Sequence, residues 1–351
     1  MAVRNRGVQA GLVAAVLFGA GTPIAKMLLG DVSPWLLAGL LYCGSGLGLG
    51  LIRIVRRSPA VRMPRNELPP LLGAIVAGGM VGPVLLMLGL SHLPASEGSL
   101  LLNAESVFTA VLAWWVFKEN VDRRIAIGML AIVVGAVLIS VPSGANLGSP
   151  LAAIAILGAC LAWGLDNNLT RKVALKDATW LACVKGLVAG PANLLLAFAF
   201  GAHLSSARSV AAAMVVGFVA YGLSLVLFIV GMRHVGTART GAYYSVAPFF
   251  GALLAVALGD AVTWPLVAGG TLMAIGVWLH LSERHEHTHR HSPVTHEHWH
   301  ADDQHHQHRH SEPVLAGTWH QHEHSHEPVA HTHEHFPDTH HRHRHHRDVQ
   351  T

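Results

Sequence analysis

Two carboxylic acids lie deep inside long apolar stretches of the sequence. Glu105 is near the middle of one stretch, and Asp166 begins the run Asp166-Asn167-Asn168 in another. A charge at mid-bilayer costs at least about 2.5–3.5 kcal/mol on insertion scales, so such residues are rare and are usually functional. Burial favours the protonated acid, which suits a group that exchanges a proton or binds a cation. The two carboxyls therefore indicate a cation site or a proton relay, and a structural pair is the alternative.

Other polar residues lie in the same stretches and extend this candidate site. Asn103 is close to Glu105 in sequence, and Thr170 follows Asp166 by one helical turn. Lys185 lies near the cytoplasmic end of its stretch, where its long side chain can reach the polar interface. The candidate substrate or proton pathway comprises Lys26, Asn103, Glu105, Asp166, Asn167 and Thr170.

The last part of the chain offers a different chemistry, that of imidazole. Of the 27 histidines, 23 lie in residues 285–351, in alternating His-x-His runs. Imidazole suits zinc, nickel, copper and cobalt, so we expect transition-metal binding with loosely specified affinity and metal identity. The alternative is a polyelectrolyte that gains charge below about pH 6.5. The candidate ligands are His285, His287, His289, His291, His296, His298, His300, His306, His308, His310, His322, His324, His326, His331, His333, His335, His341, His343 and His345.

The composition places these residues in a membrane protein. The chain is 52% hydrophobic and 13% charged, with a mean hydropathy of +0.42, which is too apolar for a soluble protein. A helix crosses a hydrocarbon core of about 30 Å with about 20 residues. The pattern predicts an all-α polytopic fold of ten transmembrane helices, at about 7–29, 34–55, 69–90, 94–117, 124–141, 150–170, 180–200, 209–231, 237–259 and 264–281.

The ten predicted spans form two similar halves. Phe108–Leu112 aligns with Phe249–Leu253, and Phe18-Gly19 aligns with Trp163-Gly164. Because each half has five spans, the halves have opposite topology, as in transporters built from inverted repeats with a binding site at mid-membrane. The predicted domains are a first repeat (1–141), a second repeat (150–282) and a disordered His-rich cytoplasmic tail (283–351), since the tail has too few apolar residues to bury a core.

Basic residues in the loops predict the orientation. Only Arg208 lies on the predicted outer side, and fifteen lie on the other: Arg4, Arg6, Arg53, Arg56, Arg57, Arg62, Arg65, Lys118, Arg123, Arg124, Arg171, Lys172, Lys176, Arg233 and Arg239. This asymmetry predicts a bacterial-type inner (plasma) membrane protein with both termini in the cytoplasm. The basic excess belongs to the membrane part, so we expect a lipid bilayer, and no nucleic acid, as partner. A homodimer is left open.

Small residues and prolines indicate how the spans pack and bend. Gly44 with Gly48, and Gly46 with Gly50, form two small-xxx-small pairs, which favour close helix packing. A proline inside a helix removes a backbone donor and bends the helix. The candidate helix hinges are Pro23, Pro83, Pro191 and Pro248. The three cysteines lie in apolar segments and are expected to pack as small core residues: Cys43, Cys160 and Cys183.

Residues 8–281 resemble the EamA-type transporters of the drug/metabolite transporter superfamily. In the first half the resemblance rests on Ser106–Leu112 and Lys118-Glu119. In the second half it rests on Thr237–Gly241, Ala247–Ala252 and Gly259-Asp260. The resemblance implies a secondary carrier that moves small metabolites by alternating access.

Three positions depart from the family pattern. Val107 stands where the family usually has the proline that Pro248 supplies in the second half, and Asp260 replaces the usual glutamate. Glu105 is not part of the pattern. The resemblance therefore gives no role for Glu105 and names no substrate.

We therefore expect a secondary-active transporter of a small solute, of the metabolite or drug class, with a metal-binding tail. One alternative is a transporter of divalent nickel, cobalt or zinc, although His92, His203, His234 and His280 all lie at or near span ends. Another is a membrane metal sensor or buffer that transports nothing. We expect no enzyme, because no nucleophile–base pair or cofactor loop is present. We expect no required cofactor, and expect the tail to bind zinc, nickel, cobalt or copper.

Overall fold

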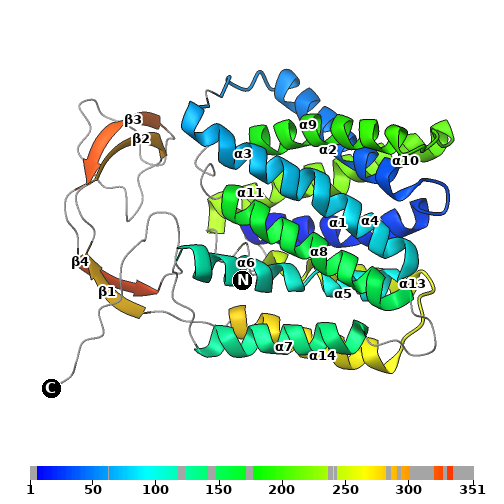
Figure 1. The fold of residues 1–351 in the computed structure, drawn as a ribbon. Coiled ribbons are helices and arrows are strands. Elements are labelled where there is room, and N and C mark those ends of the chain that lie inside the picture. The colour runs from blue at the N-terminus through cyan, green and yellow to red at the C-terminus, as the bar shows by residue number, and fades with distance from the viewer. Residues whose placement is uncertain are drawn as a thin grey trace. The chain divides into compact units, whose positions relative to one another are not determined.

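A computed structural model describes most of the chain, which forms two units, Met1–Glu283 and Arg284–Thr351. The described residues are 6–61, 63–117, 123–140, 148–170, 177–235, 240, 243–281, 286–290, 294–300, 320–326 and 330–334. The first unit is helical and the second contains strands (Figure 1).

The helices of the first unit follow the order of the predicted spans. The first half contains α1 (Arg6–Leu28), α2 (Pro34–Val55), η2 (Arg65–Glu67), α3 (Leu68–Ala74), η3 (Ile75–Val81), α4 (Gly82–His92), α5 (Ala95–Leu101), α6 (Ala104–Phe117) and α7 (Arg123–Ser140). The second half contains α8 (Gly148–Thr170), α9 (Ala178–Ala199), α10 (Ala207–Val216), η4 (Gly217–Leu223), α11 (Ser224–Val235), α13 (Ala247–Ala257) and α14 (Trp264–Leu281).

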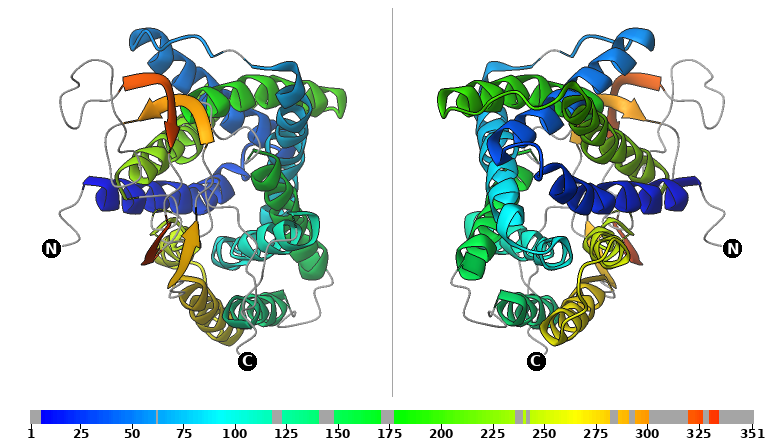
Figure 2. Two further views of the ribbon diagram at one scale, coloured as in Figure 1. Left: turned by 90° about the vertical axis from the view of Figure 1, so that its left-hand side faces the viewer. Right: turned by 90° about the vertical axis from the view of Figure 1, so that its right-hand side faces the viewer.

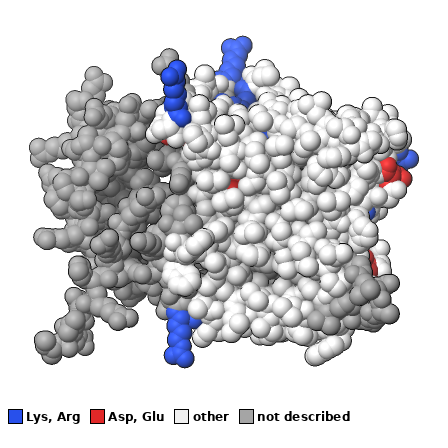
Figure 3. Space-filling model, in the orientation of Figure 1, with Lys and Arg blue, Asp and Glu red and all other residues white. Residues whose placement is uncertain are grey.

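These helices confirm an all-α polytopic membrane protein. Six helical stretches among the described residues are long and apolar enough to cross a bilayer, and three shorter apolar helices lie in further predicted spans. The face of this unit in Figure 3 is almost free of charged side chains, and Lys and Arg stand at its margins. Large apolar side chains such as Trp115 and Trp264 are exposed, as expected for a surface that meets lipid.

Four spans that the pattern predicts as continuous helices are interrupted, two in each half. The third and eighth spans contain the π-helical segments η3 and η4. The fourth span breaks at the turn Leu102-Asn103, and the ninth breaks at Ser245-Val246, directly before α13. The interruptions lie at corresponding places because the halves are repeats. Gly78 and Gly79 lie inside η3, where they weaken the regular helix, and Pro248 lies in the first turn of α13, where a missing N–H costs nothing.

The two halves meet along α2 and α9, which pack closely on each other. The segment η4 packs on α1 and α2, and η3 packs on α8 and α9, so each π-helix contacts the first two helices of the opposite half. Seen from either side in Figure 2, α7 and α14 lie next to each other at one edge of the bundle. The arrangement repeats in both halves, as inverted repeats would.

Glycines allow the contact between α2 and α9, as their spacing predicts. A Cβ on Gly46 would lie 2.5 Å from the backbone nitrogen of Leu187, and one on Gly190 would lie 2.6 Å from that of Cys43. Close backbone approach of this kind is a main source of helix association in lipid. All three cysteines are buried and free, which confirms their packing role.

Gly46→Ala is expected to lower the apparent Tm of the detergent-purified protein. The added methyl group would overlap the backbone of α9, and overpacking of this kind costs about 1–3 kcal/mol. Gly50→Ala is the matched control one turn away, because its Cβ would be 3.6 Å from the sulfur of Cys183, an ordinary contact. Equal apparent Tm values for the two variants would contradict the close approach of α2 and α9.

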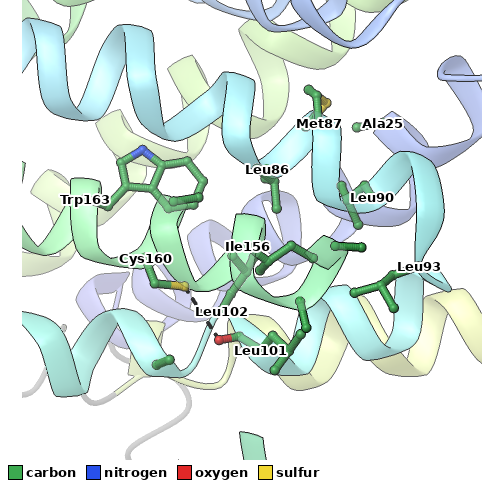
Figure 4. Close-up of a cluster of buried hydrophobic side chains, with 14 of the residues drawn as sticks. Ala25, Leu86, Met87, Leu90, Leu93, Leu101, Leu102, Ile156, Cys160 and Trp163 are labelled. Carbon is green, nitrogen blue, oxygen red and sulfur yellow. Dashed lines mark hydrogen bonds between the residues drawn. The ribbon is translucent and has the colours of Figure 1, made fainter. Parts of the chain in front are cut away.

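A large apolar core lies between α4, α5 and α8 (Figure 4). Leu86, Leu90, Leu101 and Ile156 are among its most completely buried side chains. The thiol of Cys160 donates a hydrogen bond to the carbonyl oxygen of Leu101, at an S···O distance of 3.6 Å. This core fixes α5 on α8 immediately before the break at which α6 begins.

In the second unit, the structure has four short strands where the composition predicts disorder. They are β1 (Glu286–Arg290), β2 (Val294–His300), β3 (His320–His326) and β4 (Ala330–Glu334). Strand β1 pairs with β4 and β2 pairs with β3, both antiparallel. The prediction considered only the burial of a core, whereas these strand pairs are held by hydrogen bonds between backbone groups.

Candidate functional site

Glu105 joins the two halves of the protein. It lies in the first turn of α6, where the positive end of the half-helix favours a carboxylate. Its Oε1 accepts a hydrogen bond from Nδ2 of Asn167 on α8 at 2.8 Å. The same Nδ2 lies 3.3 Å from the hydroxyl oxygen of Thr109, one turn along α6. A carboxylate, an amide and a hydroxyl therefore meet where a broken helix of one half faces a helix of the other.

Asn168 holds these two helices in register. Its buried side-chain amide donates to the carbonyl oxygens of Thr109, at 3.1 Å, and Gly164, at 2.8 Å. A Cβ on Gly164 would lie 3.0 Å from the backbone nitrogen of Thr109, so the glycine allows α6 and α8 to approach this closely. The position of Asn167 opposite Glu105 follows from this contact.

Asp166 forms a second polar group with Thr170 and Lys185. Its Oδ1 accepts hydrogen bonds from Lys185 Nζ at 2.5 Å and from the hydroxyl of Thr170 at 2.8 Å. Lys185 Nζ is also 2.8 Å from the Thr170 hydroxyl oxygen. The side chains of the ion pair are 16% and 13% exposed for lysine and aspartate. Lys185 therefore does not extend to the interface, because it pairs with a carboxylate on the neighbouring helix.

The two polar groups adjoin each other, because Asp166 directly precedes Asn167 on α8. Tyr42 lies at the same place: its hydroxyl donates a hydrogen bond to the carbonyl oxygen of Gly78, and a Cβ on Gly78 would overlap Oδ2 of Asp166. The structure thus brings Glu105 next to Asn167 and Asp166 next to Thr170, and adds tyrosines that the sequence did not single out. The role of the four predicted residues in a substrate or proton pathway stays a prediction.

Five aromatic rings border this region, and we refer to Phe18, Tyr42, Tyr221, Phe228 and Tyr244 as the aromatic cluster. Centroid distances are 5.4 Å from Phe18 to Tyr244, 5.8 Å from Phe18 to Tyr221 and 5.9 Å from Tyr42 to Tyr221. Phe228 lies 4.8 Å from Tyr244. The rings come from α1, α2, η4, α11 and the segment before α13, so both halves contribute.

The π-helix η3 supplies backbone carbonyls to the same region. The carbonyl oxygen of Gly78 accepts hydrogen bonds from the Tyr42 hydroxyl at 2.7 Å and from Trp163 Nε1 at 2.9 Å. The carbonyl oxygen of Gly79 accepts one from Asn193 Nδ2 at 3.0 Å. Irregular backbone at membrane depth needs such partners. Side chains of α2, α8 and α9 thus hold η3 in its irregular conformation.

Lys26 and Asn103, the other predicted pathway residues, make contacts elsewhere. Lys26 Nζ donates to the carbonyl oxygens of Leu90, at 2.6 Å, and Ser91, at 3.3 Å, near the C-terminal end of α4. The buried Asn103 donates to the carbonyl oxygen of Leu100 at 2.9 Å and stabilises the turn before α6. Neither makes a hydrogen bond to Glu105 or Asp166 among the contacts of the described residues.

The four candidate hinge prolines occupy two kinds of position. Pro23 and Pro191 lie inside α1 and α9. Pro83 lies in the first turn of α4, directly after η3, and Pro248 lies in the first turn of α13, directly after a turn. Pro83 and Pro248 therefore directly follow interruptions of their spans. Hinge motion at the four prolines stays a prediction.

An ion pair ties the loops at the cytoplasmic end that the sequence predicts. Arg53, at the end of α2, pairs with Asp177, which caps α9 by accepting hydrogen bonds from the backbone N–H groups of Thr179 and Trp180. Partial burial alone would raise the pKa of Asp177, but the hydrogen bonds and charge of Arg53 and the two N–H donors hold it below its ordinary value. The carboxylate is thus kept ionised.

The membrane unit contains an apolar cavity beside the polar region. Its volume is about 360 Å³, and Ala104, Val107, Phe108 and Ser140 are among the residues of α6, α7 and α8 that line it. No group of three or more His, Cys, Asp or Glu side chains that could hold a metal ion occurs among the residues that the structure describes.

The predicted tail ligands divide according to what the structure describes. His287, His289, His296, His298, His300, His322, His324, His326, His331 and His333 lie in strands, where the backbone alone is described. The others lie outside the described residues: His285, His291, His306, His308, His310, His335, His341, His343 and His345.

Comparison with known proteins places this geometry among transporters. Residues 5–141 and 150–282 each match the model of the EamA-like transporter family. An uncharacterized transporter from Methanothermobacter thermautotrophicus is 25% identical over 289 residues, covering 76% of this chain and 84% of that protein. The uncharacterized transporter YdeK from Bacillus subtilis is 28% identical over 277 residues, covering 74% and 91%.

Two further comparisons are more distant. The pseudopaline exporter CntI from Pseudomonas aeruginosa is 25% identical over 174 residues, covering 49% of this chain and 61% of the exporter. A solved crystal structure superposes with a TM-score of 0.60 at 18% sequence identity, covering 79% of this chain and 96% of that one. The latter supports the fold alone.

Proposed function

We propose that this chain, which belongs to the EamA-like transporter family, is a secondary-active carrier that moves a small organic solute by alternating access. Members of this family are transporters, so the chain is a membrane-embedded, multi-pass transporter and not an enzyme. The further proposals concern the solute, the mechanism and the metal-binding tail.

One observation carries the proposal of a central site: Glu105 lies in the first turn of a half-helix and faces Asn167 of the opposite half. Transporters built from inverted repeats bind their solutes where interrupted helices of the two halves meet near mid-membrane. The other half has a corresponding break before α13, and the π-helices η3 and η4 interrupt one further span in each half. Relative movement of the halves about these interruptions would expose the site to each side in turn.

The chemistry of the region favours a solute with an amine or another cationic group. The side chain of Glu105 accepts a hydrogen bond from the neutral amide of Asn167. A cationic solute would supply the positive charge that this neutral partner does not. Aromatic faces attract organic cations as well, and the aromatic cluster borders the two carboxyls. Pseudopaline, which the Pseudomonas relative exports, is one organic solute to test.

A divalent metal ion is the alternative cargo, favoured by the histidines of the tail. Soft-metal sites usually use several His or Cys ligands, and the described membrane residues hold no group of three metal-ligating side chains. We therefore assign transition metals to the cytoplasmic tail and an organic solute to the membrane unit. The Lys and Arg asymmetry of the loops supports an inner-membrane location with both termini in the cytoplasm.

Flux measurements in proteoliposomes test this proposal. Full-length protein and protein lacking residues 283–351 would be compared for movement of pseudopaline, a panel of organic amines, and nickel, cobalt, zinc and copper ions. We expect flux of an organic solute in both proteins. Flux of metal ions alone would make the metal the cargo, and absence of any flux across the panel would overturn the proposed solute class.

A further inference from the structure

The two strand pairs of the tail share one register. The outer pair ends with Arg290 opposite Ala330. Counting four residues forward from Arg290 and four residues back from Ala330 gives Val294 opposite His326. This is the first residue pair of β2 with β3. The two separate strand pairs β1–β4 and β2–β3 therefore follow the same antiparallel alignment of the chain.

The amino-acid sequence is mirrored about the same alignment. Residues 285–289 read His-Glu-His-Thr-His, and residues 331–335 read His-Thr-His-Glu-His, the same order reversed. Residues 296–298 and 322–324 both read His-Glu-His. An antiparallel pair joins such mirrored segments with like opposite like.

As a result, histidine stands opposite histidine at five described positions. These are His287–His333, His289–His331, His296–His324, His298–His322 and His300–His320. Directly opposed residues lie on one face of a strand pair, with Cβ atoms about 4.5–5.5 Å apart, and residues two apart along a strand share that face. Two successive histidine pairs thus place four histidine positions on one face, the number of ligands that zinc takes in closed sites.

Without a bound cation, this register is unfavourable for the stability of the strand pairs. It also places Glu286 opposite Glu334 and Glu297 opposite Glu323, and directly opposed like charges destabilise a strand pair. A slip by one residue would bring one histidine of β2, His296 or His298, opposite Glu323 and would leave no histidine of β2 opposite another histidine. The mirrored order therefore favours histidine pairing over charge pairing, which is the arrangement that a cation would stabilise.

We propose that the tail is a ladder of discrete divalent transition-metal sites, each made by two successive histidine pairs of the paired strands. Metal sites of defined position thus replace metal binding of loosely specified affinity and identity. The inference rests on the proposal that the tail binds transition metals and adds which histidine pairs would form each site. Neutral imidazole is the binding form, so binding weakens as the pH falls below about 6.5.

A register test separates the ladder from mere histidine content. In a shifted variant of the full-length protein, residues 320/321, 322/323 and 324/325 are exchanged within each pair, which preserves composition and places the moved histidines opposite Trp299, Glu297 and Thr295. In a compensated variant, residues 295/296, 297/298 and 299/300 are exchanged as well, which restores histidine opposite histidine. Zinc binding at pH 7.5 is measured by calorimetry, and amide hydrogen exchange of residues 294–300 and 320–326 is measured with and without zinc.

We expect the shifted variant to bind zinc at least tenfold more weakly or with fewer sites, and the compensated variant to recover both affinity and zinc-induced protection. Equal binding by all three proteins would overturn the ladder and leave an unstructured metal-binding tail. If the natural tail binds no zinc, the metal-binding part of the proposed function fails too, whereas organic-solute flux is unaffected by either result.

Discussion

Glu105→Gln is expected to abolish solute flux while leaving the helical bundle intact. Glutamine has nearly the same shape and keeps a side-chain oxygen that can accept the hydrogen bond from Asn167, so the contact between α6 and α8 survives. Only the charge is removed. Truncating one partner of a buried charge pair costs about 2–5 kcal/mol, which for a cationic solute corresponds to at least a thirtyfold loss of binding.

The measurement is solute uptake by proteoliposomes that contain equal amounts of folded variant, judged by apparent Tm. Glu97→Gln is the matched control, because Glu97 is a carboxylate of the same predicted span but lies in α5, before the break. We expect it to keep flux within about twofold of the natural protein. Natural flux in Glu105→Gln would show that the carboxyl is a structural group and that its charge has no part in transport.

The amino-acid pattern predicts the spans well because their apolar length is a direct requirement of the bilayer. It predicts bends only at prolines, of which Pro83 and Pro248 directly follow two of the interruptions. Leu102 and Asn103 carry no proline or glycine signal, and the turn between them depends on the Asn103 hydrogen bond and on α5 packing against α8. The π-helices η3 and η4 likewise depend on partners from the opposite half.

The site is predictable only in part for a related reason. Glu105 and Asp166 stand out as charges in apolar stretches. In contrast, Tyr42 and Tyr244 look like ordinary membrane residues until the fold brings both into the aromatic cluster. The pairing of Lys185 with Asp166 was predictable, because α8 and α9 are consecutive antiparallel helices. Lys185 lies seven residues after the start of α9, and Asp166 lies four residues before the end of α8, so the two residues have similar depths. Comparing depth on consecutive helices would have paired them.

Lys185→Met is expected to destabilise the protein strongly. It leaves the Asp166 carboxylate buried without its ammonium partner, and removing one member of a buried ion pair costs about 3–5 kcal/mol. The apparent Tm in detergent should fall accordingly. The double variant Asp166→Leu/Lys185→Met removes both charges, and such replacements are often neutral or stabilising. We expect it to regain the natural apparent Tm, and a natural apparent Tm in Lys185→Met alone would contradict the ion pair.

The double variant also separates stability from transport, because the two carboxyls have different partners. Asp166 is neutralised by Lys185 at 2.5 Å, whereas the hydrogen-bond partner of Glu105 is the neutral amide of Asn167. Glu105 is thus the carboxyl whose charge is available to a cation. Asp166 is already paired with Lys185, so we assign it the role of positioning Asn167. Since Asp166 precedes Asn167 directly, its ion pair holds the turn of α8 that faces Glu105. We therefore expect the double variant to fold normally but to transport with a raised KM, because its Asn167 is less well placed.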